Sequence, residues 1–328
     1  MVRTTSWIDV YPINESGLVR YNKLEIVNSG ARVQLSKELS DYCTEQWTPK
    51  AAKGWKSSWL AFAENLKYSS DGEQTYVTIK LGAMPFFICD GIVKSIEEQK
   101  DFAPKQGYAN SVSIGFPTAT KDGKIMLQRR APDVHCPNIL IHEPCGYMAS
   151  MNFAPRAECD LGKYAEDSRL FDLVGQLDYR KEEIAKTFSI PSELVSYELR
   201  QDFLAAGWIT KEMYFSTTGR IDVNSIELKI PENQEIFFVP FEHLKDLIYN
   251  QGKLSQINAN GYRPLDAREI PLIDETLIGL VWGYEKLTGE KLDVEDTIAR
   301  LNHDGMNIKV YPASSDGLSN EYQFPTRF

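Results

Sequence analysis

Alternating apolar and polar positions in the first hundred residues predict two β-strands with a helix between them. The stretches 18–28 and 74–82 are rich in β-branched and aromatic residues and are bounded by Asn or Gly. Within 48–74, four side chains recur at helical spacing, and we expect them to form the buried face of a helix: Trp55, Trp59, Phe62 and Leu66. Pro104 and Gly107 then break a charged segment, which indicates a domain boundary near residue 106.

Two apolar runs around Asp122-Gly123 predict a β-hairpin over 111–131. Asp-Gly between such runs is a strong signal for the tight turn of a hairpin. Pro117 falls inside the first run, where its missing N–H indicates an edge strand or a bulge.

A long helix is expected over 170–190, after a polar, turn-rich stretch that resembles an insertion. Asp167 or Ser168 could cap its start, Pro191 would end it, and Gly175 would weaken it or mark a kink. Its apolar stripe comprises Leu170, Leu173, Val174, Leu177, Ile184 and Phe188.

The remaining third of the chain predicts strands followed by helices. We expect strands in 208–219 and 222–240, the second passing through a Pro-Glu-Asn turn, and amphipathic helices in 241–252 and 269–289. The tail, 311–328, is expected to be irregular.

From residue 108 onward the order is hairpin, strand, helix, strands, helix, which favours an α/β or α+β layered sheet covered by helices. The series is not a regular βαβ repeat, so a doubly wound parallel sheet is disfavoured. We expect an N-terminal α+β extension domain over 1–106, a central domain over 107–252, and a C-terminal helical addition with a tail over 253–328.

Composition narrows the classes of partner. A formal net charge of -10 argues against general nucleic-acid binding, which needs a basic surface to replace phosphate counterions. No stretch has the length and apolarity of a membrane span, and the N-terminus lacks the apolar core of a secretory signal. Five scattered cysteines without CxxC pairs indicate reduced thiols, so we expect a cytoplasmic location.

The segment "LQRRAPDVHCPNILIHEPCGYM" (127–148) concentrates rare residues. A zinc site would use His135, Cys136, His142 and Cys145, but if 138–143 is extended the two histidines lie ~20 Å apart at ~3.3 Å per residue. Cys145 with His142 as its base would be a thiol nucleophile without an orienting third group. Local packing is the favoured interpretation of these four residues.

Arginines and carboxylates are the stronger candidates for chemistry. Arg129 and Arg130 end an apolar strand and face opposite sides of it, and the guanidinium fork suits a phosphate. Two ordinary surface arginines are an equally good interpretation.

On the 170–190 helix, Asp178 and Glu182 share a face and Glu183 lies about 100° further round. Such carboxylates can hold Mg²⁺ or Mn²⁺. Interleaved lysines and an arginine are also typical of a solvated helix face, which the spacing alone favours.

The segments in this order resemble a Nudix hydrolase domain over roughly residues 75–250. The stretches that carry the resemblance are "YVTIKLGAMPFFICDG", "SVSIGFPTATKDGKIMLQRRA", "HEPCGYM", "EEIAKTFSIP" and "EIFFVPFEHLKDLI". In that family a strand leads to a "PGG" turn and then to the box G-x5-E-x7-R-E-U-x-E-E-x-G-U.

The chain departs from this box at the positions that carry the chemistry. Placing 182–190 on R-E-U-x-E-E-x-G-U keeps Glu183 and the apolar Ile184 and Ile190. The family's arginine becomes Glu182, its paired metal-binding glutamates become Lys186 and Thr187, and its glycine becomes Ser189. "PGG" becomes "PCG", and the span from Gly146 to the helix end exceeds that of the box. The alternative is a shifted register of the helix against the box, in which Glu182 and Glu183 are the metal-binding pair.

The resemblance implies a Nudix-like α/β/α sandwich with a mixed sheet that hydrolyses a nucleoside diphosphate linked to another moiety with Mg²⁺ or Mn²⁺. Glu183 and Glu182 would be catalytic, Glu182, Glu183 and Asp178 would hold the metal, and Arg129 or Arg130 would bind phosphate. The lost glutamates keep a second hypothesis open: a catalytically inactive Nudix-fold protein that binds a nucleotide or a protein partner. We expect a small nucleotide or diphosphate ligand, no nucleic acid, no membrane, and a homodimer as the candidate assembly.

Overall fold

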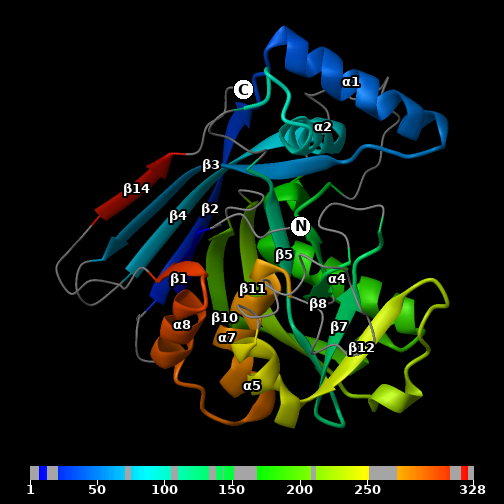
Figure 1. Cartoon of the computed structure of the whole chain (residues 1–328), viewed down its shortest axis with the longest axis vertical. Helices are drawn as coiled ribbons and strands as arrows, with labels where there is room; N and C mark the ends of the chain where they lie inside the picture. Colours follow the sequence, from blue (N-terminus) through cyan, green and yellow to red (C-terminus); the bar gives the residue numbers. More distant parts are fainter. Residues whose placement is uncertain are drawn as a thin grey trace.

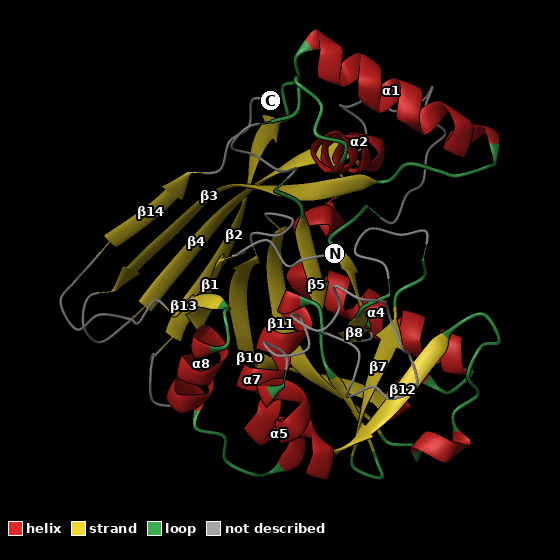
Figure 2. Cartoon of the chain, viewed as in Figure 1, coloured by secondary structure: helices red, strands yellow, loops and turns green. Residues whose placement is uncertain are grey.

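The computed structural model describes residues 7–12, 21–70, 75–104, 110–132, 138–142, 144–150, 168–207, 212–250, 272–310 and 319–323. Its elements form two sheets with helices packed on them (Figures 1 and 2). The fold is mixed α+β, as the sequence predicts.

The smaller sheet has the strand order β14-β3-β4-β2. Its strands are β2 (Tyr21–Arg32), β3 (Trp59–Ser70), β4 (Thr75–Pro85) and β14 (Ser319–Gln323). Helices α1 (Lys37–Ala52) and α2 (Phe86–Glu97) pack together at one end of the molecule, against the β3 side chains Leu60 and Phe62 (Figure 1). The strands expected in 18–28 and 74–82 are therefore confirmed.

The larger sheet runs β12-β7-β6-β11-β10-β1-β13, with three short strands pairing beside this path. Its main strands are β1 (Trp7–Pro12), β6 (Thr118–Thr120), β7 (Lys124–Arg129), β10 (Val195–Gly207), β11 (Glu212–Ile221), β12 (Glu235–Pro240) and β13 (Asn307–Val310). The short ones are β5 (Val112–Gly115), β8 (Leu140–His142) and β9 (Cys145–Tyr147).

Helices cover both faces of this sheet. In β7, Ile125 and Leu127 belong to a core with α5 (Phe241–Tyr249), α7 (Asp274–Thr288) and α8 (Val294–His303). Met126, between them, belongs to a core with α4 (Leu173–Phe188). Because successive strand side chains point to opposite faces, α4 lies on one face and the other three helices on the opposite face. This layering is compatible with the α/β/α sandwich that the resemblance implies.

The hairpin at Asp122-Gly123 is confirmed. β6 pairs antiparallel with β7, and Gly123 has φ +73°, a left-handed conformation that glycine adopts without strain. Pro117 separates β5 from β6 instead of lying within one strand. The helices expected over 241–252 and 269–289 are present as α5 and α7.

The helix expected over 48–74 is wrong. The helix here is α1, which ends before Gly54 (φ +85°), and Trp59, Phe62 and Leu66 lie in β3. Backbone pairing of β3 with β4 overrides the helical spacing of these side chains. Trp59 is buried, whereas Trp55 is half exposed.

Helix α4 begins and ends differently from the expectation. Its N-cap is Asp172, whose Oδ1 accepts the Gly175 N–H at 3.1 Å, whereas Ser168 lies in a 3-10 turn and Asp167 lies outside the described residues. A side chain at position 175 would meet the Asp172 carboxylate at 2.6 Å, so Gly175 makes room for the cap. The helix ends at Phe188, before Ser189 (φ 56°).

Two further expectations are wrong. Residues 222–230 form no strand, because the Asp122 carboxylate accepts hydrogen bonds from the Ser225 N–H (2.8 Å) and hydroxyl (2.7 Å) and holds this segment in a turn. In the tail, Ser319–Gln323 is the edge strand β14, paired antiparallel with β3, because β3 offers it an open ladder of backbone groups.

Strands from the two ends of the chain cross the boundaries expected at residues 106 and 252. β1 pairs with β10 and β13 of the larger sheet, and β14 joins the smaller sheet. The sheets are also linked directly, since Ala61 N–H donates to Met148 O at 2.9 Å and Ala63 N–H donates to Asn110 O at 2.8 Å. None of the described helices has the length and apolarity needed to cross a membrane.

Candidate functional site

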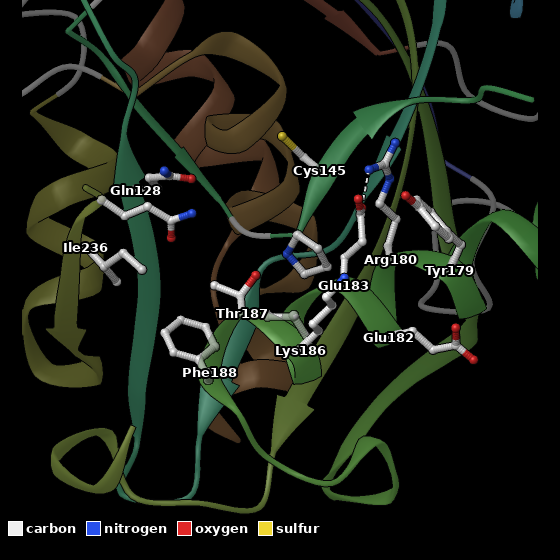
Figure 3. A pocket seen from close by; sticks show the side chains of 13 residues that line it. Gln128, Cys145, Tyr179, Arg180, Glu182, Glu183, Lys186, Thr187, Phe188 and Ile236 are labelled. Carbon is white, nitrogen blue, oxygen red and sulfur yellow. Dashed lines mark hydrogen bonds and ion pairs between the residues drawn. The ribbon is translucent and has the colours of Figure 1, made fainter. Parts of the chain in front are cut away.

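A cavity of about 500 Å³ lies between helix α4 and the strand pair β7–β12 (Figure 3). Six polar side chains of α4 line it: Tyr179, Arg180, Glu182, Glu183, Lys186 and Thr187. Gln128 and Ile236 line it from the strands, Gln234 from just before β12, and Pro144 and Cys145 from the segment at β9. The volume is in the range of a small-molecule site.

The pairing register of β7 and β12 decides which of their side chains reach the cavity. Gln128 lies opposite Ile236, and both line it. Their neighbours Arg129 and Glu235 form the next pair and do not line it. Arg129 instead donates to Glu235 (3.2 Å) and to Asn138 Oδ1 (3.2 Å).

Arg130 also lies outside the cavity lining. Its charge acts on Glu275 in the first turn of α7. Burial raises the pKa of Glu275 above its ordinary value and the Asp274 charge raises it further, while Arg130 opposes the increase. The structure therefore does not bring either predicted phosphate-binding arginine together with the α4 carboxylates.

Arg180 is the arginine that the structure places in the cavity lining. Its Nη2 donates to the Tyr147 carbonyl at 2.8 Å, and its Nη1 forms an ion pair with Glu183. Its Nε–H is buried without a hydrogen-bond partner among the described residues. A buried donor without a partner costs about 1–3 kcal/mol, which a ligand acceptor would recover.

Gly146 is the residue that lets this arginine lie against β9. A Cβ at position 146 would come within 2.6 Å of Arg180 Nη2 and 2.8 Å of its Cζ. The backbone of β9 and the guanidinium therefore fit together only when residue 146 has no side chain. The expected "PCG" turn is wrong in its structure, since Cys145–Tyr147 is a strand paired with β5, but its glycine has a packing role.

The three predicted metal ligands do not point to one place. Glu183 accepts from Arg180, and its carboxylate also raises the pKa of Tyr179 beyond the larger effect of burial on that hydroxyl. The Glu182 carboxylate points away from Thr187 and Phe188 (Figure 3). Asp178 is exposed, accepts from the Tyr197 hydroxyl at 2.7 Å, and does not line the cavity.

The residues at three positions of the family box within 182–190 lie on the face of α4 that lines the cavity. Glu183, Lys186 and Thr187 are spaced i, i+3, i+4 and all line the cavity. Ser189, at the family's glycine position, has the left-handed φ of 56° that glycine favours. This face presents one carboxylate and one ammonium, and the described residues hold no cluster of three His, Cys, Asp or Glu side chains suited to a metal. The described donors do not fit a divalent cation, and metal binding by α4 stays a prediction.

Of the four other candidates from 127–148, one is buried away from the cavity, one lines the cavity, and two lie outside the described residues. His142 is fully buried, with Nδ1 at 2.9 Å from Thr276 Oγ1 and Nε2 hydrogen-bonded to Tyr214. Burial lowers its pKa to about 3, so the ring is neutral. Cys145 lines the cavity, whereas His135 and Cys136 lie outside the described residues.

Comparison with known proteins adds little to this geometry. No family model matches the chain, and no curated protein matches its sequence. Among solved structures, a Nudix hydrolase from M. smegmatis, RenU, is similar over 55% of this chain and 84% of its own, with 13% sequence identity and a TM-score of 0.28. A TM-score this low carries no argument about function.

Sequence reasoning missed Arg180, Gln128 and Gly146 as site residues. Spacing along the helix places Arg180 among the cations of a solvated face, because spacing alone does not show that residue 147 lies against it. Glycine after "PC" was the one available signal, since a glycine within a strand often marks a close approach by another group.

Replacing Gly146 by alanine is expected to weaken ligand binding and to lower the free energy of unfolding by about 1–3 kcal/mol. The new methyl group displaces the guanidinium of Arg180 and disrupts its bonds to Tyr147 and Glu183. Chemical denaturation and ligand titration of the same sample measure both effects. An affinity equal to that of the unmodified protein would show that Arg180 does not contact the ligand.

Proposed function

We propose that the chain is a Nudix-like protein that binds a nucleoside diphosphate linked to another moiety in the cavity between α4 and β7–β12. The observation that carries the proposal is the pair of cationic groups in the cavity lining. Lys186 Nζ has no partner among the described residues, and Arg180 Nε–H is buried without one. Two phosphoryl groups would supply acceptors for both donors.

The uncharged residues of the cavity lining support a ligand that carries a base or a sugar as well as phosphate. Gln128 and Gln234 offer amide donors and acceptors, and Ile236 offers apolar surface. A base or sugar needs this mixture, whereas inorganic phosphate would use the cations alone. The net charge of -10 is consistent with a small anion held locally and not with a polyanion.

The test is a calorimetric titration with ADP-ribose, ADP and adenosine, each in EDTA and in Mg²⁺. We expect ADP-ribose and ADP to bind with dissociation constants in the micromolar range and adenosine to bind at least about 10-fold more weakly, since it lacks the phosphates. Equal affinity for adenosine, or no binding of either phosphorylated compound, would contradict the proposal.

Hydrolysis is the second candidate, and one observation favours it: the adjacent carboxylates Glu182 and Glu183 both line the cavity. In this candidate function, one of these carboxylates would orient the attacking water. Release of nucleoside monophosphate from ADP-ribose would identify this activity. It must disappear in a Glu182→Gln, Glu183→Gln double variant that still binds the nucleotide.

A further inference from the structure

We propose that the ammonium of Lys186 takes the place of a divalent cation at the ligand's phosphates, so that this cavity binds its ligand without metal. The inference rests on the proposed binding function and concerns the charge that makes binding possible. No covalent step is involved.

Four charged side chains of α4 line the cavity. Arg180 and Glu183 form an ion pair and so cancel one another. Glu182 also lines the cavity, but its carboxylate points away from Thr187 and Phe188 (Figure 3). Lys186 is exposed, and its Nζ has no ion-pair partner in the described part of the chain. At the Thr187–Phe188 end of the cavity, the remaining charged group of α4 is therefore the Lys186 ammonium.

The Lys186 ammonium belongs to the C-terminal end of its helix. Lys186 lies in the last turn of α4, which ends at Phe188. The C-terminal end of a helix carries a partial negative charge, which favours a cation and repels a phosphate. An anion that binds beside this turn therefore needs a cation next to it. The Lys186 ammonium is the cation that the chain itself supplies.

A divalent cation would not share the position of the Lys186 ammonium. Glu183, Lys186 and Thr187 point from one face of α4 into the cavity, so a divalent cation held by Glu183 would lie beside the ammonium. Like charges at this spacing repel, and the only carboxylate of the three already accepts from Arg180. A lysine ammonium, by contrast, reaches a phosphate as a compact point charge.

The experiment measures the affinity for ADP-ribose by calorimetry in EDTA and in an excess of MgCl₂. For the unmodified protein we expect the two affinities to agree within about 2-fold. Lys186→Met should weaken binding by about 10- to 100-fold in both buffers, since it removes a charge-assisted hydrogen bond. The matched control is Lys181→Met on the same helix, which does not line the cavity and should bind unchanged.

A gain-of-function variant tests the same inference in the opposite direction. Lys186→Glu with Thr187→Glu places three carboxylates at the i, i+3, i+4 positions of the cavity face. We expect this variant to bind Mn²⁺ in the absence of nucleotide, detected by electron paramagnetic resonance, and to bind ADP-ribose only when metal is present. Thermal unfolding of each variant shows that it is folded.

The possible failures are distinguishable. If the unmodified protein needs Mg²⁺ to bind, or if Lys186→Met binds as tightly as Lys181→Met, the role of Lys186 is refuted while the binding function stands. If ADP-ribose does not bind in either buffer, the proposed function fails, and this inference fails with it.

Discussion

Replacing Phe62 by alanine is expected to lower the free energy of unfolding by about 3–5 kcal/mol, the usual range for a fully buried phenylalanine. Phe62 is 0% exposed and belongs to the core between β3 and the helices α1 and α2. Its ring fills the space over Gly82 on the neighbouring strand, where a Cβ would come within 2.5 Å of it. The substitution removes the ring from a site that glycine cannot fill.

The size of this effect also depends on the position of Phe62 at the junction of the two sheets. The flanking residues Ala61 and Ala63 donate backbone hydrogen bonds to Met148 and Asn110, which belong to the segments beside the larger sheet. Loss of packing on the helix side of β3 therefore acts on a strand that supports both sheets.

Urea denaturation followed by circular dichroism measures the change. Ile226→Ala is the matched control, because Ile226 is 90% exposed and its truncation should change stability by less than about 0.5 kcal/mol. A loss below about 1 kcal/mol for Phe62→Ala would show that β3 is not packed in this way.

The second large effect is a dependence of stability on pH that originates in His142. Burial lowers the pKa of this histidine to about 3 in the folded state, whereas it is about 6.5 in the unfolded chain. Between these values the unfolded state binds a proton and the folded state does not. Stability is therefore fully present above about pH 6.5 and is lost as the pH falls towards 3, by about 2.5 kcal/mol at pH 4.5.

His142→Gln should remove this dependence. At pH 7 the variant is expected to be less stable by about 1–3 kcal/mol, because the hydrogen bonds with Thr276 and Tyr214 are altered in a fully buried position. At pH 4.5 the difference should shrink to about 0.5 kcal/mol or reverse in sign, because the unmodified protein has lost about 2.5 kcal/mol there. Chemical denaturation at both pH values measures it.

The control for this prediction is His303→Gln. The His303 side chain is 89% exposed, so its surroundings are similar in the folded and unfolded states and the pH profile should stay that of the unmodified protein. Parallel profiles for the unmodified protein and His142→Gln would contradict the buried, neutral histidine.

Local signals were enough to predict the elements whose stabilising interactions lie close in sequence. Asp122-Gly123 specifies the β6–β7 hairpin because its turn geometry is a property of those residues. The amphipathic stretches over α5 and α7 predict helices that bury one face against the sheet. For the site, the same reasoning placed Glu182 and Glu183 on the helix that lines the cavity.

Local signals failed where partners distant in sequence decide the outcome. Trp59, Phe62 and Leu66 have helical spacing, yet hydrogen bonding to β4 on one side and β14 on the other makes their segment a strand. The strand in the tail could not be predicted either, because β14 is stabilised by β3, about 250 residues earlier in the chain.

The sequence by itself determined the α+β class, the hairpin, the amphipathic helices, and a cationic and a carboxylate group spaced on one helix. Only the tertiary structure decided which arginine faces the cavity. The register of β7 against β12 turns Arg129 away and Gln128 inward, and Gly146 admits Arg180 from a helix that begins 27 residues later, at Leu173. Side-chain direction in a strand changes with every single residue, so a site between a strand and a helix depends on a pairing register that neither segment encodes alone.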